Sequence, residues 1–172
     1  ALMKDQVMNL RRRNIAAAAI HTGLTHDEIL ATLENCVFGA VKILYVSPER
    51  LSSELFCTKL RHIKVSFVTV DEAHCISQWG YDFRPSYLRI ADIRAMLPGV
   101  PVLALTATAT PAVVDDIQDK LGFGSHNVFR MSFERKNLAY VVRRSADKEA
   151  EALHILQRVD GPAIVYVRSR AK

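Results

Sequence analysis

The sequence predicts an α/β protein in which a parallel sheet is covered by helices on both faces. Short runs rich in Val, Ile and Leu alternate along the chain with longer amphipathic segments. Strands that are apolar on both faces are typical of buried parallel sheets, and their alternation with helices is typical of α/β folds. Of the 172 residues, 49% are apolar and 24% are charged, which is ordinary for a globular protein.

The expected elements follow one another from the N-terminus. Apolar residues at helical spacing predict helices at 2–12, 25–34, 51–60, 86–96, 111–121 and 148–159. Runs of β-branched and other apolar residues predict strands at 15–20, 42–46, 65–70, 102–105, 127–131, 138–142 and 163–167. Thr25 with Glu28 forms a capping box at the second helix, and Thr110 before Pro111 gives a cap and a first-turn proline at the fifth.

The strand expected at 65–70 is followed directly by Asp71-Glu72-Ala73-His74. In open α/β sheets the ligand crevice lies outside the carboxyl ends of the strands. An Asp at the end of such a strand holds Mg²⁺ in P-loop NTPases. The tetrapeptide therefore predicts a site for a nucleotide phosphate and its magnesium. The alternative is an exposed acidic pair that caps a helix.

The next segment, 75–87, holds four aromatic residues and an Arg and has neither helical nor strand periodicity. Aromatic faces stack on nucleic-acid bases whatever the sequence, at roughly 1–3 kcal/mol per base, and an Arg nearby can hold a phosphate. We expect this role for Trp79, Phe83 and Arg84. The alternative for Trp79 and Phe83 is that they fill the edge of the core.

Together these motifs resemble the RecQ family of DNA helicases, which belong to the DExH-box helicases of superfamily 2. The matching pieces run in order through nearly the whole chain, at 2–7, 47–51, 71–87, 104–110, 132–137 and 164–170. The Ser-Gln-Trp-Gly-x-Asp-Phe-Arg-Pro sequence discriminates between families. Other DExH helicases share the acidic DEAH box and the Thr-Ala-Thr motif but lack this loop.

The resemblance implies a RecA-like sheet and two motor lobes. Residues 1–131 would be a partial first lobe, 132–137 the inter-lobe linker, and 138–172 the beginning of the second lobe. None of the seven glycines is followed by Lys, so the Gly-Lys-Ser/Thr of a Walker A loop is missing. We therefore expect an internal fragment that is inactive alone. Its last 40 or so residues cannot form a domain by themselves, and cut sheet edges favour self-association.

The resemblance also implies a role for each member of the acidic box. Asp71 should hold Mg²⁺ through a water, because magnesium keeps much of its hydration shell. Glu72 should orient and deprotonate the attacking water, since phosphoryl transfer depends on positioning and charge stabilisation. His74 should couple the phosphate site to the next motif, although a single His is more often an interior residue.

Further residues are assigned by the same resemblance. Thr106 and Thr108, with Gln78 of the aromatic-rich loop, should relay the ATP state toward DNA. Other residues fall in motifs that contact the DNA backbone in related helicases, which positions the strand without reading its sequence; they are Lys4, Ser47, Arg50, Arg168 and Arg170. The chain departs from the family at Val167-Arg168, where Cys-Asn is usual, and at Tyr81, where many members carry His.

The implied cofactors are ATP and Mg²⁺, with zinc only in a downstream domain, and the implied partners are single-stranded and duplex DNA. The net charge of +5 supports a polyanionic partner weakly, because the single tight basic run, 11–13, also suits a helix end. Three Cys without C-x-x-C spacing indicate structural thiols in a reducing compartment. No apolar stretch reaches the ~20 residues of a membrane span.

The expected activity is ATP-dependent unwinding of duplex DNA in replication, recombination or repair. The protein would then work in the cytoplasm at the nucleoid of a bacterium, or in the nucleus of a eukaryote. The alternative is a nucleotide-independent nucleic-acid-binding or scaffolding module that keeps the lobe and has lost the motor. A Gly-Lys-Ser/Thr loop encoded just upstream would separate the two hypotheses.

Overall fold

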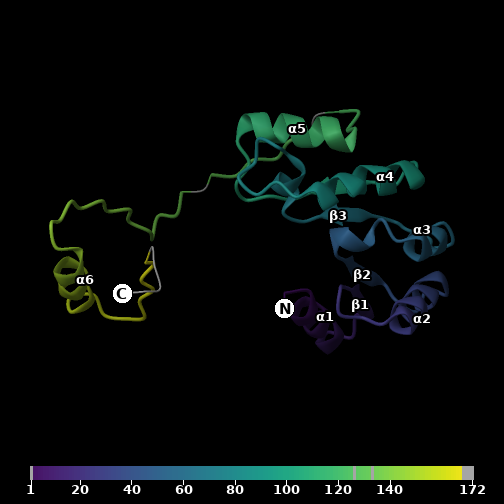
Figure 1. Cartoon of the computed structure of the whole chain (residues 1–172), viewed down its shortest axis with the longest axis horizontal. Coiled ribbons are helices and arrows are strands. Elements are labelled where there is room, and N and C mark those ends of the chain that lie inside the picture. The colour runs from purple at the N-terminus through teal and green to yellow at the C-terminus, as the bar shows by residue number, and fades with distance from the viewer. Residues whose placement is uncertain (1, 126, 133, 168–172) are drawn as a thin grey trace. The chain divides into compact units, whose positions relative to one another are not determined.

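The computed structural model of the protein describes residues 2–125, 127–132 and 134–167. The chain divides into two compact units, Ala1–Asn127 and Val128–Lys172, and Figure 1 labels the helices and strands. The expected end of the first lobe, at residue 131, lies a few residues past this division. The assignment of the two units to two motor lobes stays a prediction.

The first unit alternates helices with short strands, as expected. Its helices are α1 (Leu2–Arg12), α2 (His26–Val37), α3 (Glu54–Leu60), α4 (Arg89–Met96) and α5 (Pro111–Leu121). Its strands are β1 (Ala17–Ile20), β2 (Ile43–Val46), β3 (Val68–Val70) and β4 (Val102–Ala104). Three 3-10 turns, η1 (Pro48–Arg50), η2 (Ala73–Ile76) and η3 (Pro85–Leu88), lie between them.

The strands pair in parallel, but in two separate pairs. β1 lies beside β2, with Ala17 opposite Ile43, and β3 lies beside β4, with Val68 opposite Val102. The expectation of one continuous sheet is therefore wrong for the described residues, whereas the α/β class and the parallel pairing are confirmed. Apolar runs mark which residues can form strands. Which strands pair depends on contacts far apart in the sequence, which a local pattern does not contain.

Both predicted helix starts are confirmed. Thr25 N donates to Glu28 Oε2 at 2.8 Å, and Glu28 N donates to Thr25 Oγ1 at 3.3 Å, which is a complete capping box. Thr110 Oγ1 accepts from Val113 N at the start of α5. α3 and α4 begin a few residues later than expected, because the proline-led turns η1 and η3 precede them.

Two clusters of buried residues form the core of the first unit. One lies under β1, α2 and α3 and contains Ile20, Ile29, Leu33, Phe56, Leu60 and Ile93. The other joins β3, η2, η3, α4 and α5 and contains Val70, Ala73, Cys75, Ile76, Tyr87, Ile90, Val113, Ile117 and Leu121. α4 contributes Ile90 to one cluster and Ile93 to the other. The second cluster is the support on which the acidic box rests.

The second unit contains one helix, α6 (Lys148–Leu156), and none of that helix's residues is buried. The strands expected at 127–131, 138–142 and 163–167 are wrong, because the structure has no strand in these segments. Strands need partners and a buried face, and a unit of this size offers neither easily. Arg168 and Arg170 lie outside the described residues. Across the described part of the chain, no helix is long and apolar enough to cross a membrane.

Candidate functional site

The acidic box lies at the carboxyl ends of two paired strands. Leu105 N donates to Val70 O at 2.8 Å, and Ala73 N donates to Leu105 O at 2.9 Å, so the chain after β3 is tied to the chain after β4. Val70 and Ala73 are buried, while Asp71 and Glu72 between them are exposed. The core thus holds the backbone and leaves both carboxylates at the surface.

Glu72 has a left-handed backbone, with φ 50° and ψ 41°. A residue other than glycine in this region costs on the order of 1–2 kcal/mol and is found where the surroundings enforce it, often at functional sites. Glu72 N donates to Asp71 Oδ1 at 2.9 Å. The turn therefore fixes the two carboxylates next to each other at the strand end.

His74 is buried beside Glu72 and is 3% exposed. Its Nδ1 lies 3.3 Å from Glu72 Oε2 and 3.1 Å from Thr106 Oγ1. On its other side the ring stacks on Tyr81, with centroids 4.8 Å apart and planes 17° apart. The expected contact of His74 with the Thr-Ala-Thr motif is present, whereas the contact with Tyr81 was not predicted.

The loop after the box presents its aromatic residues to solvent. Trp79 is 79% exposed and Tyr81 is 77% exposed, while Phe83 is half-buried. The alternative that Trp79 fills the core is therefore wrong, and Phe83 has an intermediate position. Gln78 is exposed beside Trp79.

Gly80 brings this loop against the backbone of the acidic box. A Cβ at this position would lie 2.6 Å from His74 O, closer than any real side chain allows, and Gly80 N donates to Ser77 O. Only glycine permits so close an approach of two chain segments. The loop's path is therefore fixed by the box that precedes it.

Arg84 is held by two contacts. Its guanidinium pairs with Asp82 Oδ2 at 2.5 Å, and Arg84 N donates to Cys75 O at 2.9 Å. The hydrogen bond from Arg84 lowers the pKa of Asp82. More than half of the Arg84 side chain, 54%, is exposed, so the guanidinium can also reach a ligand in solution.

The Thr-Ala-Thr motif follows β4. Thr106 is half-buried and contacts His74, whereas Thr108 is exposed and its N–H donates to Thr106 Oγ1 at 3.4 Å. Of the two predicted relay residues, Thr106 therefore touches the acidic box and Thr108 reaches it only through Thr106.

Three of the residues predicted to contact the DNA backbone, Lys4, Ser47 and Arg50, lie near one another at a second site. A pocket of about 440 Å³ is lined by Met3, Lys4, His21, Thr22, Gly23, Ser47 and Glu49. Ser47 Oγ and Arg50 Nε are buried without a hydrogen-bond partner, and Arg50 also donates to His21 O at 3.2 Å. Glu49 accepts from Ser86 in the aromatic-rich segment at 3.4 Å, which links this pocket to the loop.

His21, Thr22 and Gly23, which also line this pocket, lie outside the motifs and were not predicted as site residues. They follow β1 directly, as the acidic box follows β3. The rule that ligands bind beyond the carboxyl ends of strands would have found them.

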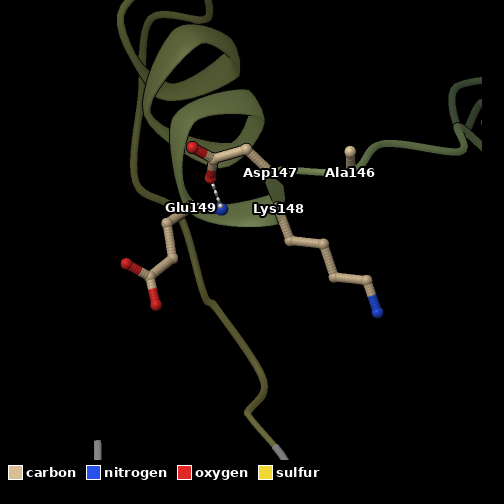
Figure 2. A pocket seen from close by; sticks show the side chains of 4 residues that line it. All are labelled: Ala146, Asp147, Lys148 and Glu149. Atoms are coloured by element: carbon tan, nitrogen blue, oxygen red, sulfur yellow. Dashed lines mark hydrogen bonds between the residues drawn. The ribbon is translucent and has the colours of Figure 1, made fainter.

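A hollow of about 470 Å³ at the start of α6 has a different character (Figure 2). It is lined by Ala146, Asp147, Lys148 and Glu149. Asp147 Oδ1 already accepts from Glu149 N and Ala150 N, at 3.1 and 3.0 Å. The free N–H groups that would attract an anion to a helix start are thus used by the cap.

The comparisons with known proteins agree with the motifs. Residues 1–117 match the profile described as DEAD/DEAH box helicase. The chain is 45% identical over 172 residues to ATP-dependent DNA helicase RecQ of Bacillus subtilis (strain 168), covering 99% of this chain and 29% of that protein. It is 39% identical over 173 residues to ATP-dependent DNA helicase RecQ of Pasteurella multocida (strain Pm70), covering 100% and 27% respectively.

A plant relative, ATP-dependent DNA helicase Q-like 4B of Arabidopsis thaliana, is 38% identical over 182 residues, covering 99% of this chain and 16% of that protein. The chain thus spans less than a third of the length of these three relatives. The resemblance to RecQ helicases, first seen in the acidic box and the loop after it, is confirmed along the whole chain. The chain belongs to the DEAD/DEAH box helicase family.

Proposed function

We propose that this chain is the central part of an ATP-dependent DNA helicase, in which nucleotide hydrolysis at the acidic box is coupled to single-stranded DNA at the aromatic-rich loop. The observation that carries the proposal is the position of His74. One ring touches Glu72, Thr106 and Tyr81. A change at the phosphate side therefore has a direct path of contacts to the loop.

The acidic box suits Mg²⁺ and a phosphate ligand by its donor set. Asp71 and Glu72 offer exposed carboxylate oxygens, which are hard ligands of the kind magnesium prefers. Asp71 would hold the ion through a water, and Glu72 would orient a water and take its proton. Bound Mg²⁺ would neutralise charge on the phosphates. His74, by holding Glu72 Oε2, would act as a positioning residue.

The loop and the pocket suit a nucleic-acid strand. Exposed Trp79 would stack on bases, with Phe83 beside it, and Arg84 would hold a phosphate or stack. Lys4, Ser47 and Arg50 would contact the backbone. The orphaned hydroxyl of Ser47 supports this assignment, because a buried donor without a partner costs about 1–3 kcal/mol until a ligand satisfies it.

Parts of the proposed function rest on the sequence and on the relatives. Arg168 and Arg170 are assigned to DNA by sequence alone. Unwinding of duplex DNA is proposed for the whole protein because relatives more than three times as long as this chain are named ATP-dependent DNA helicase RecQ. A DNA-acting protein of this kind would work at the nucleoid or in the nucleus.

DNA binding can be tested on the chain itself, because Trp79 is its single Trp and its fluorescence therefore reports on the loop. Titration with a poly-dT oligonucleotide should quench the intrinsic fluorescence, and salt should weaken the binding. Arg84→Ala should reduce the affinity, whereas Arg89→Ala, which removes an exposed Arg paired with Asp92, should not. DNA binding measured by anisotropy without any Trp79 quenching would remove the loop from the DNA site.

The proposed ATP hydrolysis must be tested in a longer form of the protein that contains a Gly-Lys-Ser/Thr loop. There, single-stranded DNA should stimulate ATP hydrolysis, and Trp79→Ala should abolish the stimulation while basal hydrolysis stays. The chain alone should show no hydrolysis above background, since its sequence contains no phosphate cradle. DNA binding by a longer form that never responds to ATP would favour the nucleotide-independent module instead.

A further inference from the structure

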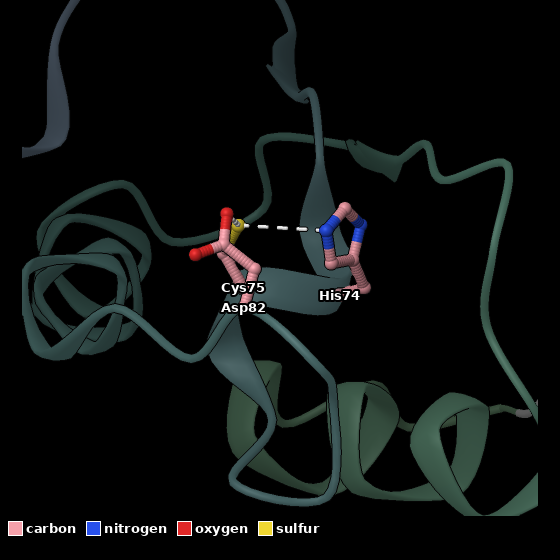
Figure 3. A group of neighbouring side chains, drawn as sticks. All are labelled: His74, Cys75 and Asp82. Atoms are coloured by element: carbon pink, nitrogen blue, oxygen red, sulfur yellow. Dashed lines mark hydrogen bonds between the residues drawn. The ribbon is translucent and has the colours of Figure 1, made fainter. Parts of the chain in front are cut away.

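Three metal-ligating side chains, one of them from the acidic box, meet apart from Asp71, the carboxylate assigned to magnesium. His74, Cys75 and Asp82 each offer one ligand atom, and these atoms lie within 4.8 Å of one another. Figure 3 shows a ring nitrogen of His74 turned toward the Cys75 sulfur. Sequence spacing gave no sign of the group, because residues 74, 75 and 82 meet only through the turn of the loop.

The distances suit a tetrahedral ion. Cys75 Sγ lies 3.7 Å from His74 Nε2 and 3.8 Å from Asp82 Oδ2. Ligand bonds of about 2.0–2.3 Å at tetrahedral angles place neighbouring ligand atoms about 3.5 Å apart. The two distances to Cys75 Sγ are within a few tenths of an ångström of this value, and the ligand atoms of His74 and Asp82, within 4.8 Å of each other, would close on an ion by a movement of about an ångström of the half-buried Asp82 side chain.

The neighbours of His74 also leave the correct nitrogen available. Its Nδ1 faces Glu72 Oε2 at 3.3 Å and Thr106 Oγ1 at 3.1 Å. A carboxylate can only accept a hydrogen bond, so Nδ1 is the nitrogen that would carry the hydrogen when the ring ligates a metal. The lone pair is then on Nε2, toward Cys75. A carboxylate behind a ligating His is the usual second partner in zinc sites.

We propose that His74, Cys75 and Asp82 form a binding site for Zn²⁺, with water as the fourth ligand. One nitrogen, one sulfur and one carboxylate oxygen form the donor set of a borderline-soft ion rather than of Mg²⁺. His74 and Cys75 are 3% and 1% exposed. Most of the ion would therefore be shielded from water. The inference concerns metal binding alone and stands apart from the proposed function.

Binding requires two changes at the site. Cys75 must lose its proton to solvent as the zinc–sulfur bond forms. Asp82 must exchange at least part of its pairing with Arg84 for the ion, which the exposed guanidinium permits by turning toward solvent. Burial raises the pKa of the Cys75 thiol, so the thiol is protonated before the metal arrives and one proton is released per ion bound.

The affinity should accordingly rise with pH, by about tenfold per unit while the free thiol is protonated. Several charged groups bear on this thiol from the box, the loop and η3. Arg84 favours the thiolate and the carboxylates oppose it; the groups that face it are Glu72, His74, Asp82, Arg84 and Tyr87. The pH slope therefore tests the release of one proton and does not depend on the absolute value of the pKa.

The experiment is a titration of the whole chain with Co²⁺, followed by displacement with Zn²⁺. Co²⁺ should give a thiolate-to-metal charge-transfer band at one equivalent, and Zn²⁺ should remove it. Cys75→Ser should abolish the band. Asp82→Asn should keep a thiolate band but weaken affinity at least ~10-fold, since losing a ligand costs at least as much as losing an outer partner.

Matched variants separate this site from surface binding. Cys57→Ser removes the half-buried thiol, and Asp92→Asn removes a carboxylate that is also paired with an Arg; both should titrate like the wild type. Circular dichroism checks that each variant is folded. The proposal is overturned if the wild type gives no thiolate band, or if the band survives Cys75→Ser. Should Cys75→Ser fail to fold, unchanged Co²⁺ affinity in folded Asp82→Asn overturns it equally.

Discussion

The segments 65–70 and 163–167 have similar apolar, β-branched sequences, yet only the first forms a strand. Val68–Val70 pairs with Val102–Ala104 and rests on a cluster that includes α4 and α5. Residues 163–167 have no strand partner among the described residues, and Ile164 and Tyr166 are 79% and 90% exposed. Strand propensity thus becomes a strand only where a neighbour and a buried face exist. The acidic box and the aromatic-rich loop follow the strand that has both.

The largest expected effect is on ATP hydrolysis at Glu72, which follows the paired strand β3. In a longer form with a Gly-Lys-Ser/Thr loop, Glu72→Gln should keep nucleotide binding and lower hydrolysis by ~10²–10⁴-fold, the usual contribution of a positioned general base. Glu149→Gln, in the second unit, should leave hydrolysis unchanged. A coupled ATPase assay measures both. Unchanged turnover in Glu72→Gln would exclude Glu72 as the base.

The next effect is on stability. Leu33 is fully buried in α2, whereas Leu153 in α6 is 57% exposed. Leu33→Ala should lower the free energy of unfolding by about 2–5 kcal/mol, through lost burial and the cavity left behind. Leu153→Ala should change it by less than about 0.5 kcal/mol. Urea unfolding measures the difference, and equal losses would mean that the second unit has a core of its own.

The predictions from the sequence were mostly correct in the first unit and mostly wrong in the second. α1 and α5 have the predicted bounds, and the caps at Thr25 and Thr110 are formed, because helices and caps depend on residues close in sequence. The prediction of three strands between residues 127 and 167 was wrong, because a local pattern does not show whether a neighbouring strand is available for pairing. The acidic box lies at a strand end as expected, because it directly follows that strand in the sequence.

Long-range contacts at the site were harder to predict. The stacking of Tyr81 on His74 and the approach of Asp82 to Cys75 depend on the turn at Gly80, where the loop packs against His74 O. The expected contact of His74 with Thr106 came from the motif resemblance. Physical reasoning from the residues alone would not have found it.

A smaller effect is expected at the helix caps. Thr110→Ala removes the hydrogen bond to Val113 N in a helix packed on the core, and should lower the free energy of unfolding by ~1 kcal/mol. Asp147→Ala removes two such bonds from α6, which has no buried residue. It should therefore shift amide exchange at the start of α6 without moving the unfolding midpoint of the first unit. A shifted midpoint would show that the two units unfold together.

The smallest effect is a pH dependence carried by Asp116, on the face of α5 toward the loop. Burial acts to raise the pKa of this carboxyl, but hydrogen bonds from Ser77 and Lys120 outweigh it, and the net pKa is lowered. A lowered folded-state pKa stabilises the protein above the unfolded value of about 3.9, and this stabilisation is lost as the pH falls through the folded value.

Asp116→Asn should therefore lower stability at neutral pH by about 1 kcal/mol or less, because the pair with Lys120 is partly exposed. As the pH falls from about 4 through the folded-state pKa of Asp116, the variant and the wild type should converge. Asp115→Asn, an exposed carboxyl on the same helix, should show neither effect. Urea midpoints measured across this range decide the matter: a constant difference down to acid pH would mean that Asp116 stabilises α5 by packing rather than by its charge.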